Sequence, residues 1–345
     1  MWKNILLLLA TIIVCLLIIE LAFRLVSPGE PPGTTYGKIV QLNSDGLRDV
    51  EFAIPKPEGR YRILFLGDSF TWGIGLDLSE TLPKQCLREL QKEFDNVEVV
   101  NASTPAYNTV DELLLLEQKG LKYQPDLVVL VYCLNDIQYK PHLVTVPYDS
   151  SKVVPIFQVE KRDGRIATDI GTGLRAFIFK CQMKSQFLAF LVPRVGAFLK
   201  KLGVIHDPRY SWEKMALQGY VDQNPGWLEA KRALSEIADL CQEHRIKLIA
   251  AIYPFLINFE TYGSQPVHES ISEYMHSLGI PNVDLLTAFE PYKSGRKFWI
   301  NYLNAHPNAE AQNIAAQALL PLIIQQMRTE PPQVSNSKSE PASPP

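Results

Sequence analysis

A run of four apolar residues that ends abruptly in a polar turn constrains the fold of this chain more than any other segment. Residues 63–66 (ILFL) lie between Arg62 and Gly67, and Asp68 and Ser69 follow at once. A short apolar run bounded in this way is typical of a strand buried on both faces of a parallel sheet. Such sheets place ligands beyond the carboxyl ends of their strands. A serine at that point is exposed on a tight turn, where a nucleophile is useful.

Strand-like and helix-like segments alternate along the rest of the chain. We predict strands at 62–67, 97–101, 126–133, 246–253 and 281–285, and helices at 79–94, 109–122, 228–244, 266–278 and 307–327. This alternation predicts an α/β protein whose parallel sheet is covered by helices on both faces.

Three further polar segments occur at informative places. They are residues 102–109 after the second strand, residues 134–136 (LND) after the third, and residues 304–309 (NAHPNA) near the end. Together with residues 67–73 (GDSFTWG) and 45–48 (DGLR), this series resembles the SGNH (GDSL-type) hydrolase family over roughly residues 43–325. More narrowly, it resembles the membrane-anchored bacterial members that carry a leading hydrophobic segment.

The resemblance implies a site and a fold. Ser69 would be the nucleophile and one backbone oxyanion donor, and His306 the general base. Ala106 stands where the family has a glycine that donates a backbone N–H to the oxyanion, and Asn135 would donate a side-chain N–H. Because glycine accepts backbone angles that alanine does not, the loop at Ala106 is expected to differ. The implied fold is a flavodoxin-like three-layer α/β/α SGNH hydrolase fold with a parallel sheet, preceded by one N-terminal transmembrane helix.

The partner of the base departs from the family pattern. Related sequences carry an aspartate two or three residues before the histidine, where this chain has Leu303 and Asn304. That aspartate fixes the imidazole tautomer and stabilises the imidazolium, whereas an asparagine carbonyl accepts the Nδ1 proton without supplying charge. Three interpretations stay open: a weakened hydrolase in which Asn304 orients His306, loss of catalysis with retention of binding, or orientation by another carboxylate, namely Asp284, Glu290 or Glu310.

Each candidate residue also has a purely structural interpretation. His306 precedes Pro307 and could simply lead into the last helix. Asn135 and Asp136 could form a plain turn at a strand end. Asp68 is expected to be structural, because an Asx-type side chain readily accepts hydrogen bonds from the N–H groups of a following turn.

Composition argues against several other classes of protein. The 345 residues are 46% hydrophobic and 21% charged, with a net charge of −3 and no dense basic stretch, so nucleic acid is not an expected partner. Five cysteines without C-x-x-C spacing indicate neither a disulfide framework nor a zinc site. The sequence carries no metal or cofactor motif, and we expect no cofactor.

An apolar segment at residues 5–23, interrupted by Thr11 and Glu20, predicts contact with a membrane. At about 1.5 Å per residue it would span roughly 28 Å, near the thickness of a bilayer core. No A-x-A cleavage site follows, so residues 1–27 are predicted to be an uncleaved transmembrane signal anchor. Positive charge does not orient it. The family resemblance implies a single-pass protein of the cell membrane whose catalytic domain lies outside the cytoplasm.

The remaining organisation follows from composition and length. Residues 28–61 are predicted to be an irregular linker and approach segment, 62–328 an SGNH hydrolase-like domain, and 329–345 a disordered tail. An interruption at about 137–226 is too long for an ordinary loop. Within it, residues 185–202 show apolar residues at helical spacing, which predicts an amphipathic helix that either packs on the core or forms a lid or membrane-surface helix.

The resemblance, together with the predicted anchor, implies a membrane-anchored serine esterase or deacetylase of the SGNH type that acts on acyl esters, with acyl groups on envelope or exported carbohydrate as the implied substrate. His306 would take the Ser69 proton as Ser69 attacks the ester carbonyl. If a carbohydrate hydroxyl rather than water accepts the acyl group, the protein would be an O-acyltransferase. The alternative from another class is a non-catalytic binding or assembly module of a cell-envelope complex, which the missing carboxylate favours.

Overall fold

The computed structural model of the chain describes residues 14–22, 38–137, 209–301 and 304–329, together with the short pieces 3, 11, 34–35, 161–162, 165–166, 187, 191, 195 and 198. The chain divides into two compact units, one of residues 1–37 and 150–208 and the other of residues 38–149 and 209–345. The second unit carries every residue that the sequence analysis assigned to the site.

The first unit contains the predicted anchor. Residues 14–22 are helical. Among the described residues, no helix combines the length and the apolar character that a membrane span requires. Most of the predicted span at 5–23 outside that helix is not among the described residues, so the anchor stays a prediction.

The first unit also contains much of the predicted interruption. The described residues of the predicted helix at 185–202, namely 187, 191, 195 and 198, are helical, and the rest of that segment lies outside the described residues. The predicted tail lies outside them as well, apart from Thr329. The strands among the described residues of this unit are β1 (Thr34–Thr35) and the antiparallel pair β6 (Lys161–Arg162) and β7 (Arg165–Ile166).

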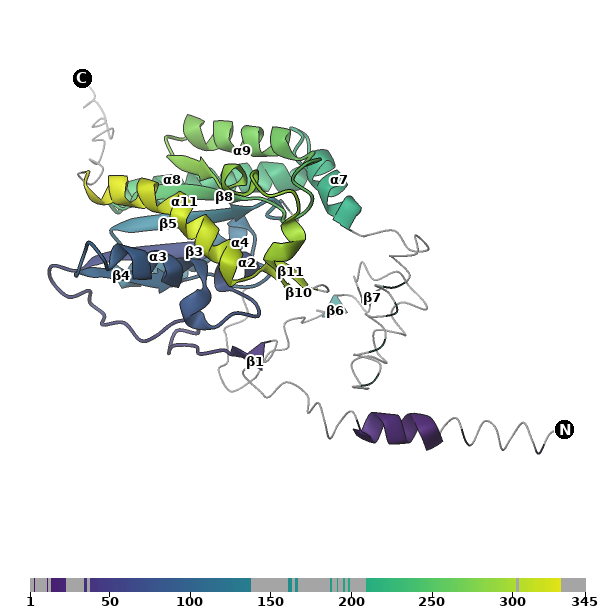
Figure 1. Ribbon diagram of the computed structural model, residues 1–345. Helices are drawn as coiled ribbons and strands as arrows, with labels where there is room; N and C mark the ends of the chain where they lie inside the picture. The colour runs from purple at the N-terminus through teal and green to yellow at the C-terminus, as the bar shows by residue number, and fades with distance from the viewer. Residues whose placement is uncertain are drawn as a thin grey trace, which may run out of the picture. The chain divides into compact units, whose positions relative to one another are not determined.

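Five parallel strands form the main sheet of the second unit (Figure 1). They are β3 (Tyr61–Gly67), β4 (Val97–Asn101), β5 (Leu127–Cys133), β8 (Lys247–Tyr253) and β9 (Asn282–Asp284). Their order across the sheet is β4-β3-β5-β8-β9, and each neighbouring pair is parallel. This corresponds to the 2-1-3-4-5 order of flavodoxin-like folds. The predicted parallel sheet and its strand order are therefore confirmed.

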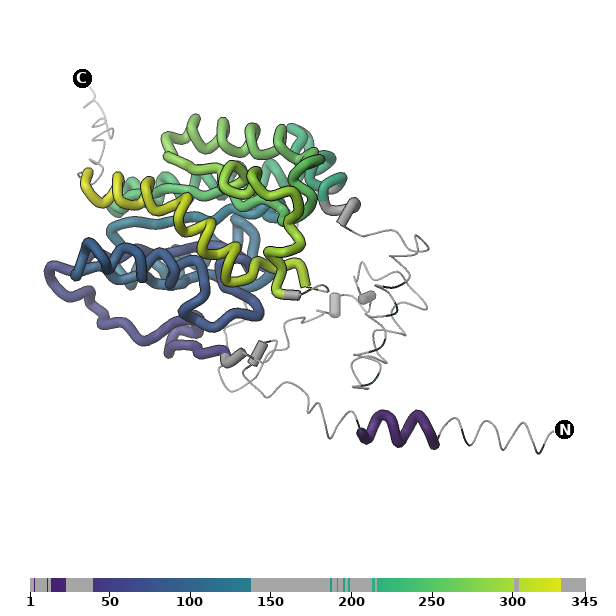
Figure 2. The backbone as a smooth tube through the Cα atoms, in the orientation of Figure 1, coloured from purple at the N-terminus to yellow at the C-terminus, as the bar shows by residue number. Residues whose placement is uncertain are grey.

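Apolar side chains of the strands alternate between two cores, one on each face of the sheet. The helices that cover the faces are α3 (Leu82–Leu90), α4 (Thr109–Gln118), α8 (Pro225–Glu243), α9 (Gln265–Ser277) and α11 (Ala309–Met327). Leu64 and Val128 belong to the core under α4, α8 and α9, whereas Ile63 and Val129 belong to the core under α3 and α11. Figure 2 shows α3 and α11 together on their face. The result is the predicted three-layer α/β/α arrangement.

Two predicted helices each divide in two. The helix predicted at 79–94 becomes the 3-10 helix η1 (Leu78–Glu80) and α3, because Pro83 is tolerated only in the first turn of an α-helix. The helix predicted at 109–122 becomes α4 and η2 (Gly120–Tyr123). Elements that periodicity did not predict are β2 (Lys38–Ile39), α2 (Ser69–Trp72), α7 (Arg209–Gly219), α10 (Leu286–Phe289), η3 (Gly295–Phe298), β10 (Trp299–Asn301) and β11 (Asn304–Pro307).

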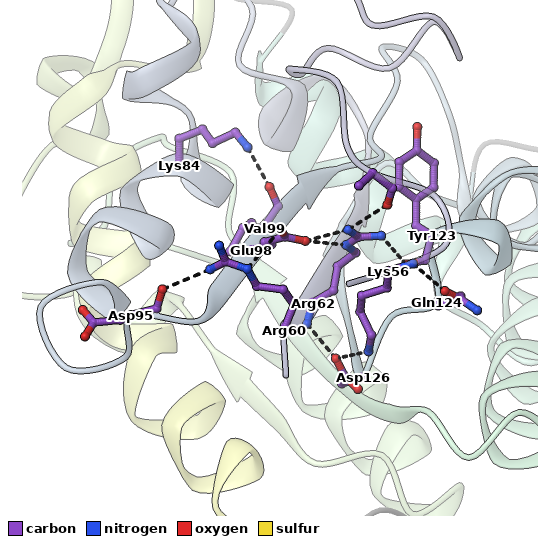
Figure 3. A network of polar contacts seen from close by, with 11 residues as sticks. Lys56, Arg60, Arg62, Lys84, Asp95, Glu98, Val99, Tyr123, Gln124 and Asp126 are labelled. Atoms are coloured by element: carbon purple, nitrogen blue, oxygen red, sulfur yellow. Dashed lines mark hydrogen bonds and ion pairs between the residues drawn. The ribbon is translucent and has the colours of Figure 1, made fainter. Parts of the chain in front are cut away.

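A charged network holds the amino end of β3 (Figure 3). The Arg62 side chain is fully buried, and its Nε and Nη2 both donate to Glu98 Oε2 on β4, at 2.8 and 2.6 Å. Its Nη1 donates to the Tyr123 carbonyl at 2.8 Å, and Asp126 accepts the Arg62 backbone N–H at 2.6 Å. A buried guanidinium needs such partners, because an unpaired buried charge is strongly destabilising. The network ties β3 to the strands on either side and leaves the carboxyl end of the sheet for the site.

The approach segment before β3 packs more closely than the predicted linker. Residues 40–60 contain no helix or strand, yet Leu47, Arg48 and Asp49 are buried. Asp49 accepts the Asn101 N–H at 2.7 Å and pairs with Lys84 at 2.6 Å. This segment therefore supports both β4 and α3, and it belongs to the second unit rather than only leading to it.

Candidate active site

Ser69 lies on the turn directly after β3, at the start of α2. The turn requires glycine at position 67, because a Cβ there would lie 2.3 Å from Thr71 Oγ1. Asp68 is the N-cap of α2, and its Oδ1 accepts the Phe70 N–H at 2.8 Å. Asp68 thus makes the Asx-type contact expected of it, and the turn holds the Ser69 hydroxyl at the carboxyl edge of the sheet.

Arg48 supports the other end of that turn. Its Nη1 donates to the carbonyls of Trp72 at 2.7 Å and Gly73 at 2.5 Å, and its Nη2 donates to the carbonyl of Leu76. The guanidinium carbon lies 4.4 Å from the centroid of the Trp72 ring. Burial lowers the pKa of Arg48 to about 10, so the side chain stays charged at neutral pH. Sequence reasoning assigned no role to Arg48, and the only signal for it was the DGLR segment.

The fold brings His306 to Ser69. His306 lies on β11, which pairs antiparallel with β10, and its Nε2 is 3.0 Å from Ser69 Oγ. That separation suits transfer of a proton from a hydroxyl to an imidazole. Asn308, and not His306, is the N-cap of α11, so His306 does not simply lead into the last helix.

Asn304 is the partner of the His306 ring. Its Oδ1 lies 2.5 Å from His306 Nδ1 and accepts the His306 backbone N–H at 3.1 Å. Because an amide oxygen only accepts, Nδ1 carries the ring proton and Nε2 keeps a lone pair toward Ser69. Asn304 is buried, and its Nδ2 has no hydrogen-bond partner among the described residues. The amide therefore orients the ring but brings no charge to it.

The three carboxylates considered as substitutes for the missing aspartate lie elsewhere. Asp284 Oδ1 is 2.8 Å from Nδ1 of a different histidine, His268. Glu310 pairs with a surface lysine at 3.0 Å, and Glu290 is exposed. None of the three has a hydrogen bond to His306 in the part of the chain that the structure describes. The interpretation in which one of them orients the ring is therefore not supported.

Ala106 adopts a backbone angle that favours glycine. Its φ is +65°, in the left-handed region. The loop is held beside the Ser69 turn, because Thr104 donates its N–H to the Gly67 carbonyl at 3.0 Å. Ala106 therefore adopts the left-handed backbone conformation that a glycine would adopt, and it does so at a cost in backbone strain.

Asn135 follows β5 and reaches the same turn. Its Nδ2 donates to Asp68 Oδ2 at 3.2 Å. Asp136 makes a local contact instead, because its Oδ2 accepts the Cys133 N–H at 3.0 Å. The plain-turn interpretation thus describes Asp136 but not Asn135. An amide nitrogen carries two N–H groups, so one of them can serve a substrate while the other holds the contact with Asp68.

Two opposing effects set the pKa of His306. Burial lowers the pKa below its usual 6.5, and the negative charge of Asp68 acts in the other direction. The Phe70 ring lies edge-on to the imidazole, with centroids 5.7 Å apart. The net direction keeps His306 neutral at pH 7, which is the form that accepts a proton.

The described residues contain neither a metal-binding cluster nor a disulfide. No group of three or more His, Cys, Asp or Glu side chains among them is placed to hold a metal ion. The described cysteines, which are Cys15, Cys86, Cys133 and Cys241, carry no disulfide. What the site assembles is a hydroxyl, a neutral imidazole and several N–H donors, the groups used for acyl transfer through a serine.

Comparisons with known proteins find a matching family model and similar solved structures. The sequence model of the GDSL-like lipase/acylhydrolase family matches residues 65–314. Similar solved structures include TesA, with 14% identity and a TM-score of 0.45 over 77% of this chain and 99% of the other. The psychrotrophic esterase EstA from Pseudoalteromonas sp. has 13% identity and a TM-score of 0.43 over 78% and 99%. The lipase/acylhydrolase from Enterococcus faecalis has 15% identity and a TM-score of 0.42 over 79% and 99%. No curated protein matches the chain.

Proposed function

Because the chain belongs to the GDSL-like lipase/acylhydrolase family, we propose that it is a serine esterase that hydrolyses acyl esters through Ser69 and His306. The observation that carries this proposal is the 3.0 Å separation between Ser69 Oγ and His306 Nε2. The other nitrogen of the same imidazole, Nδ1, lies 2.5 Å from Asn304 Oδ1. The hydroxyl and its proton acceptor are therefore aligned, and the acceptor is in the tautomer that the reaction needs.

In the proposed reaction, His306 Nε2 accepts the Ser69 proton as Oγ attacks the ester carbonyl carbon. The imidazolium gives this proton to the alcohol oxygen as the C–O bond breaks, which leaves an acyl ester on Ser69. Water then attacks the acyl carbon while Nε2 takes its proton, and the acid is released with Ser69 restored. Asn304 keeps a proton on Nδ1 throughout, so one ring nitrogen serves both steps.

Three donors are proposed to hold the oxyanion of the tetrahedral intermediate: the backbone N–H groups of Ser69 and Ala106, and the Asn135 side chain. Each follows one of three adjacent parallel strands, β3, β4 and β5. The contact of Asn135 with Asp68 supports the proposal, because it fixes the amide before substrate binds. One such donor contributes about 3 kcal/mol to the stability of the transition state.

We propose further that the acyl group is small, such as acetyl, and that carbohydrate of the envelope or an exported polysaccharide carries it. This step rests on family membership and on the anchor predicted at residues 1–27. A series of p-nitrophenyl esters from acetate to octanoate tests the acyl group, and acetate release from an acetylated polysaccharide tests the carrier. A preference for octanoate would contradict a small acyl group, and transfer to a sugar hydroxyl would indicate an O-acyltransferase.

Hydrolysis of p-nitrophenyl acetate by the full-length chain in detergent tests the central proposal. We expect Ser69→Ala to lower kcat by about 10⁴-fold or more, because the nucleophile is removed. Ser277→Ala is the control: this exposed hydroxyl on α9 bonds the Tyr274 carbonyl, and activity should not change. Equal background rates in the wild type and Ser69→Ala would contradict the proposal and favour a binding module or an acyltransferase that requires its own donor.

A further inference from the structure

Asp68 places a buried carboxylate directly beside the nucleophile. Its side chain is almost fully buried. Oδ1 accepts the Phe70 N–H at 2.8 Å and lies 3.3 Å from Cys133 Sγ. Oδ2 accepts from Asn135 Nδ2 at 3.2 Å and lies 3.5 Å from Ser69 Oγ. The Phe70 N–H, the Cys133 thiol and the Asn135 amide can each donate a hydrogen to Asp68, and an ionised carboxylate only accepts. The surroundings of Asp68 therefore match a carboxylate, although capping Phe70 alone would not need a charge.

We infer that Asp68 supplies the negative charge that stabilises the imidazolium form of His306 during catalysis, in place of the carboxylate that is absent at position 304. The inference rests on the proposed serine-esterase function and concerns the same site. Asp68 is a positioning residue in this role, because it acts on the imidazole through space and not by contact with the substrate.

Asp68 and the His306 imidazole lie on either side of the Ser69 hydroxyl. Asp68 Oδ2 and His306 Nε2 approach the same atom, Ser69 Oγ, at 3.5 and 3.0 Å. Opposite charges on either side of one shared atom attract more strongly in a buried site than at the surface, because the effective dielectric constant is lower there. In a Ser-His-Asp triad the aspartate both orients the ring and supplies charge from the Nδ1 side. Here the two tasks are divided: Asn304 orients from Nδ1, and Asp68 supplies charge from the Nε2 side.

The other groups near the ring do not replace this charge. The charged groups on the elements that contact β11 are Asp68 before α2, Arg296 and Lys297 on η3, and Glu310 on α11, and none of the last three is negative and unpaired. Cys133 and Asp136 lie at the end of β5, where Cys133 contacts Asp68. The Cys133 thiol is neutral, because burial and the nearby Asp68 charge hold its pKa well above the usual value. Asp136 bonds the backbone of Cys133, and Glu310 pairs with a lysine at the surface. Burial lowers the pKa of His306, and among the described residues Asp68 is the group whose charge opposes that effect.

The substitution Asp68→Asn removes the charge and keeps an oxygen that can cap the Phe70 N–H. We expect kcat for p-nitrophenyl acetate to fall roughly 10- to 100-fold with little change in KM, because the lost interaction is made in the transition state. The acid limb of the kcat/KM profile should move to lower pH, because the charge that raised the pKa of His306 is gone.

A double-mutant cycle with Asn304→Asp separates this role from capping. In the Asn304→Asp background a carboxylate already stabilises the imidazolium, so adding Asp68→Asn should lower kcat at least about fivefold less than it does in the wild type. An equal loss in both backgrounds, with an acid limb that does not move, would overturn the inference and leave Asp68 as a residue that caps α2 and holds the Asn135 amide.

Two controls complete the experiment. Glu310→Gln removes an exposed charge from α11 and should change neither kcat nor the acid limb, since solvent screens that group. If circular dichroism shows that Asp68→Asn does not fold, Asp68→Ser replaces it, because serine also caps a helix. Failure of the proposed function would appear separately, as equal rates in the wild type and Ser69→Ala. A loss in Ser69→Ala with no effect of the Asp68 variants overturns this inference alone.

Discussion

The two halves of the proposed active site each depart at one residue from the pattern that the sequence resemblance implies, and the departures have different consequences. In the nucleophile half, formed at the ends of β3, β4 and β5, Ala106 replaces a glycine and keeps φ at +65°. In the base half, formed by β10 and β11, Asn304 replaces an aspartate and keeps a 2.5 Å contact to His306 Nδ1. Both replacements preserve geometry. A backbone N–H is the same group in alanine and glycine, however, whereas an amide does not carry the charge of a carboxylate.

The comparison shows what each half can tolerate. A role of the main chain survives a change of side chain at a cost in backbone strain. A role that depends on charge survives only if another charge lies close enough, which is the part that we assign to Asp68. The nucleophile half also holds more of the supporting ions, since Arg48 and Asp49 are buried there with several partners each.

We expect the largest loss of stability from a substitution that removes the support of the nucleophile half. Arg48→Met removes the donors to the carbonyls of Trp72, Gly73 and Leu76. We expect the free energy of unfolding to fall by about 3–5 kcal/mol, because buried carbonyls lose their partners. Urea unfolding followed by circular dichroism measures this loss, and esterase activity should fall with it because the Ser69 turn loosens.

A surface arginine provides the control for that experiment. The Arg88 side chain on α3 is 55% exposed, so Arg88→Met should change the free energy of unfolding by no more than about 0.5 kcal/mol. If Arg48→Met costs no more than Arg88→Met, the approach segment does not support the nucleophile turn.

The next largest effect is expected from a substitution that places a carboxylate in the base half, and it tests whether the missing charge limits the rate. Asn304→Asp should raise kcat several-fold, up to about tenfold, because the carboxylate stabilises the imidazolium. It should also raise the pKa of His306, so the acid limb moves to higher pH and the gain seen at pH 7–8 shrinks below pH 6.5. Kinetics across that pH range measure both effects.

The same substitution is expected to cost stability. Asn304 Nδ2 has no hydrogen-bond partner among the described residues, so an aspartate would bury a carboxylate oxygen there, and we expect a loss of about 1–3 kcal/mol in urea unfolding. Asn258→Asp, an amide-to-carboxylate change at an exposed position, is the control and should leave kcat unchanged. If kcat of Asn304→Asp does not exceed that of the wild type, the missing charge at position 304 does not limit the rate of catalysis.

The sheet and the nucleophile half can be predicted from the sequence for a common reason. The runs at 63–66 and 127–133 are apolar on both faces, and such runs specify buried parallel strands without knowledge of distant contacts. Ser69 and Asn135 directly follow two of these strands, so their meeting at one edge follows from the parallel arrangement.

The base half and the supporting charges depend on contacts that local patterns do not contain. β10 and β11 are too short for periodicity to show, and they form because they pair with each other. A buried Arg48 is not distinguishable in sequence from an exposed arginine, and its partners are carbonyls of a distant turn. The contact of Asp68 with Asn135 likewise exists only after β3 and β5 are side by side.

The smallest expected effect returns to Ala106 and tests whether its role is confined to the main chain. Ala106→Gly should raise the free energy of unfolding by about 0.5–1 kcal/mol, because relief of the left-handed strain exceeds the added entropy of the unfolded glycine chain. Because the N–H group is retained, kcat should change by less than about twofold. Ala53→Gly, at an exposed loop position outside the left-handed region, should lower stability instead. If both variants lose stability alike, Ala106 is not strained; if kcat of Ala106→Gly falls sharply, the methyl group and not only the backbone matters in the nucleophile half.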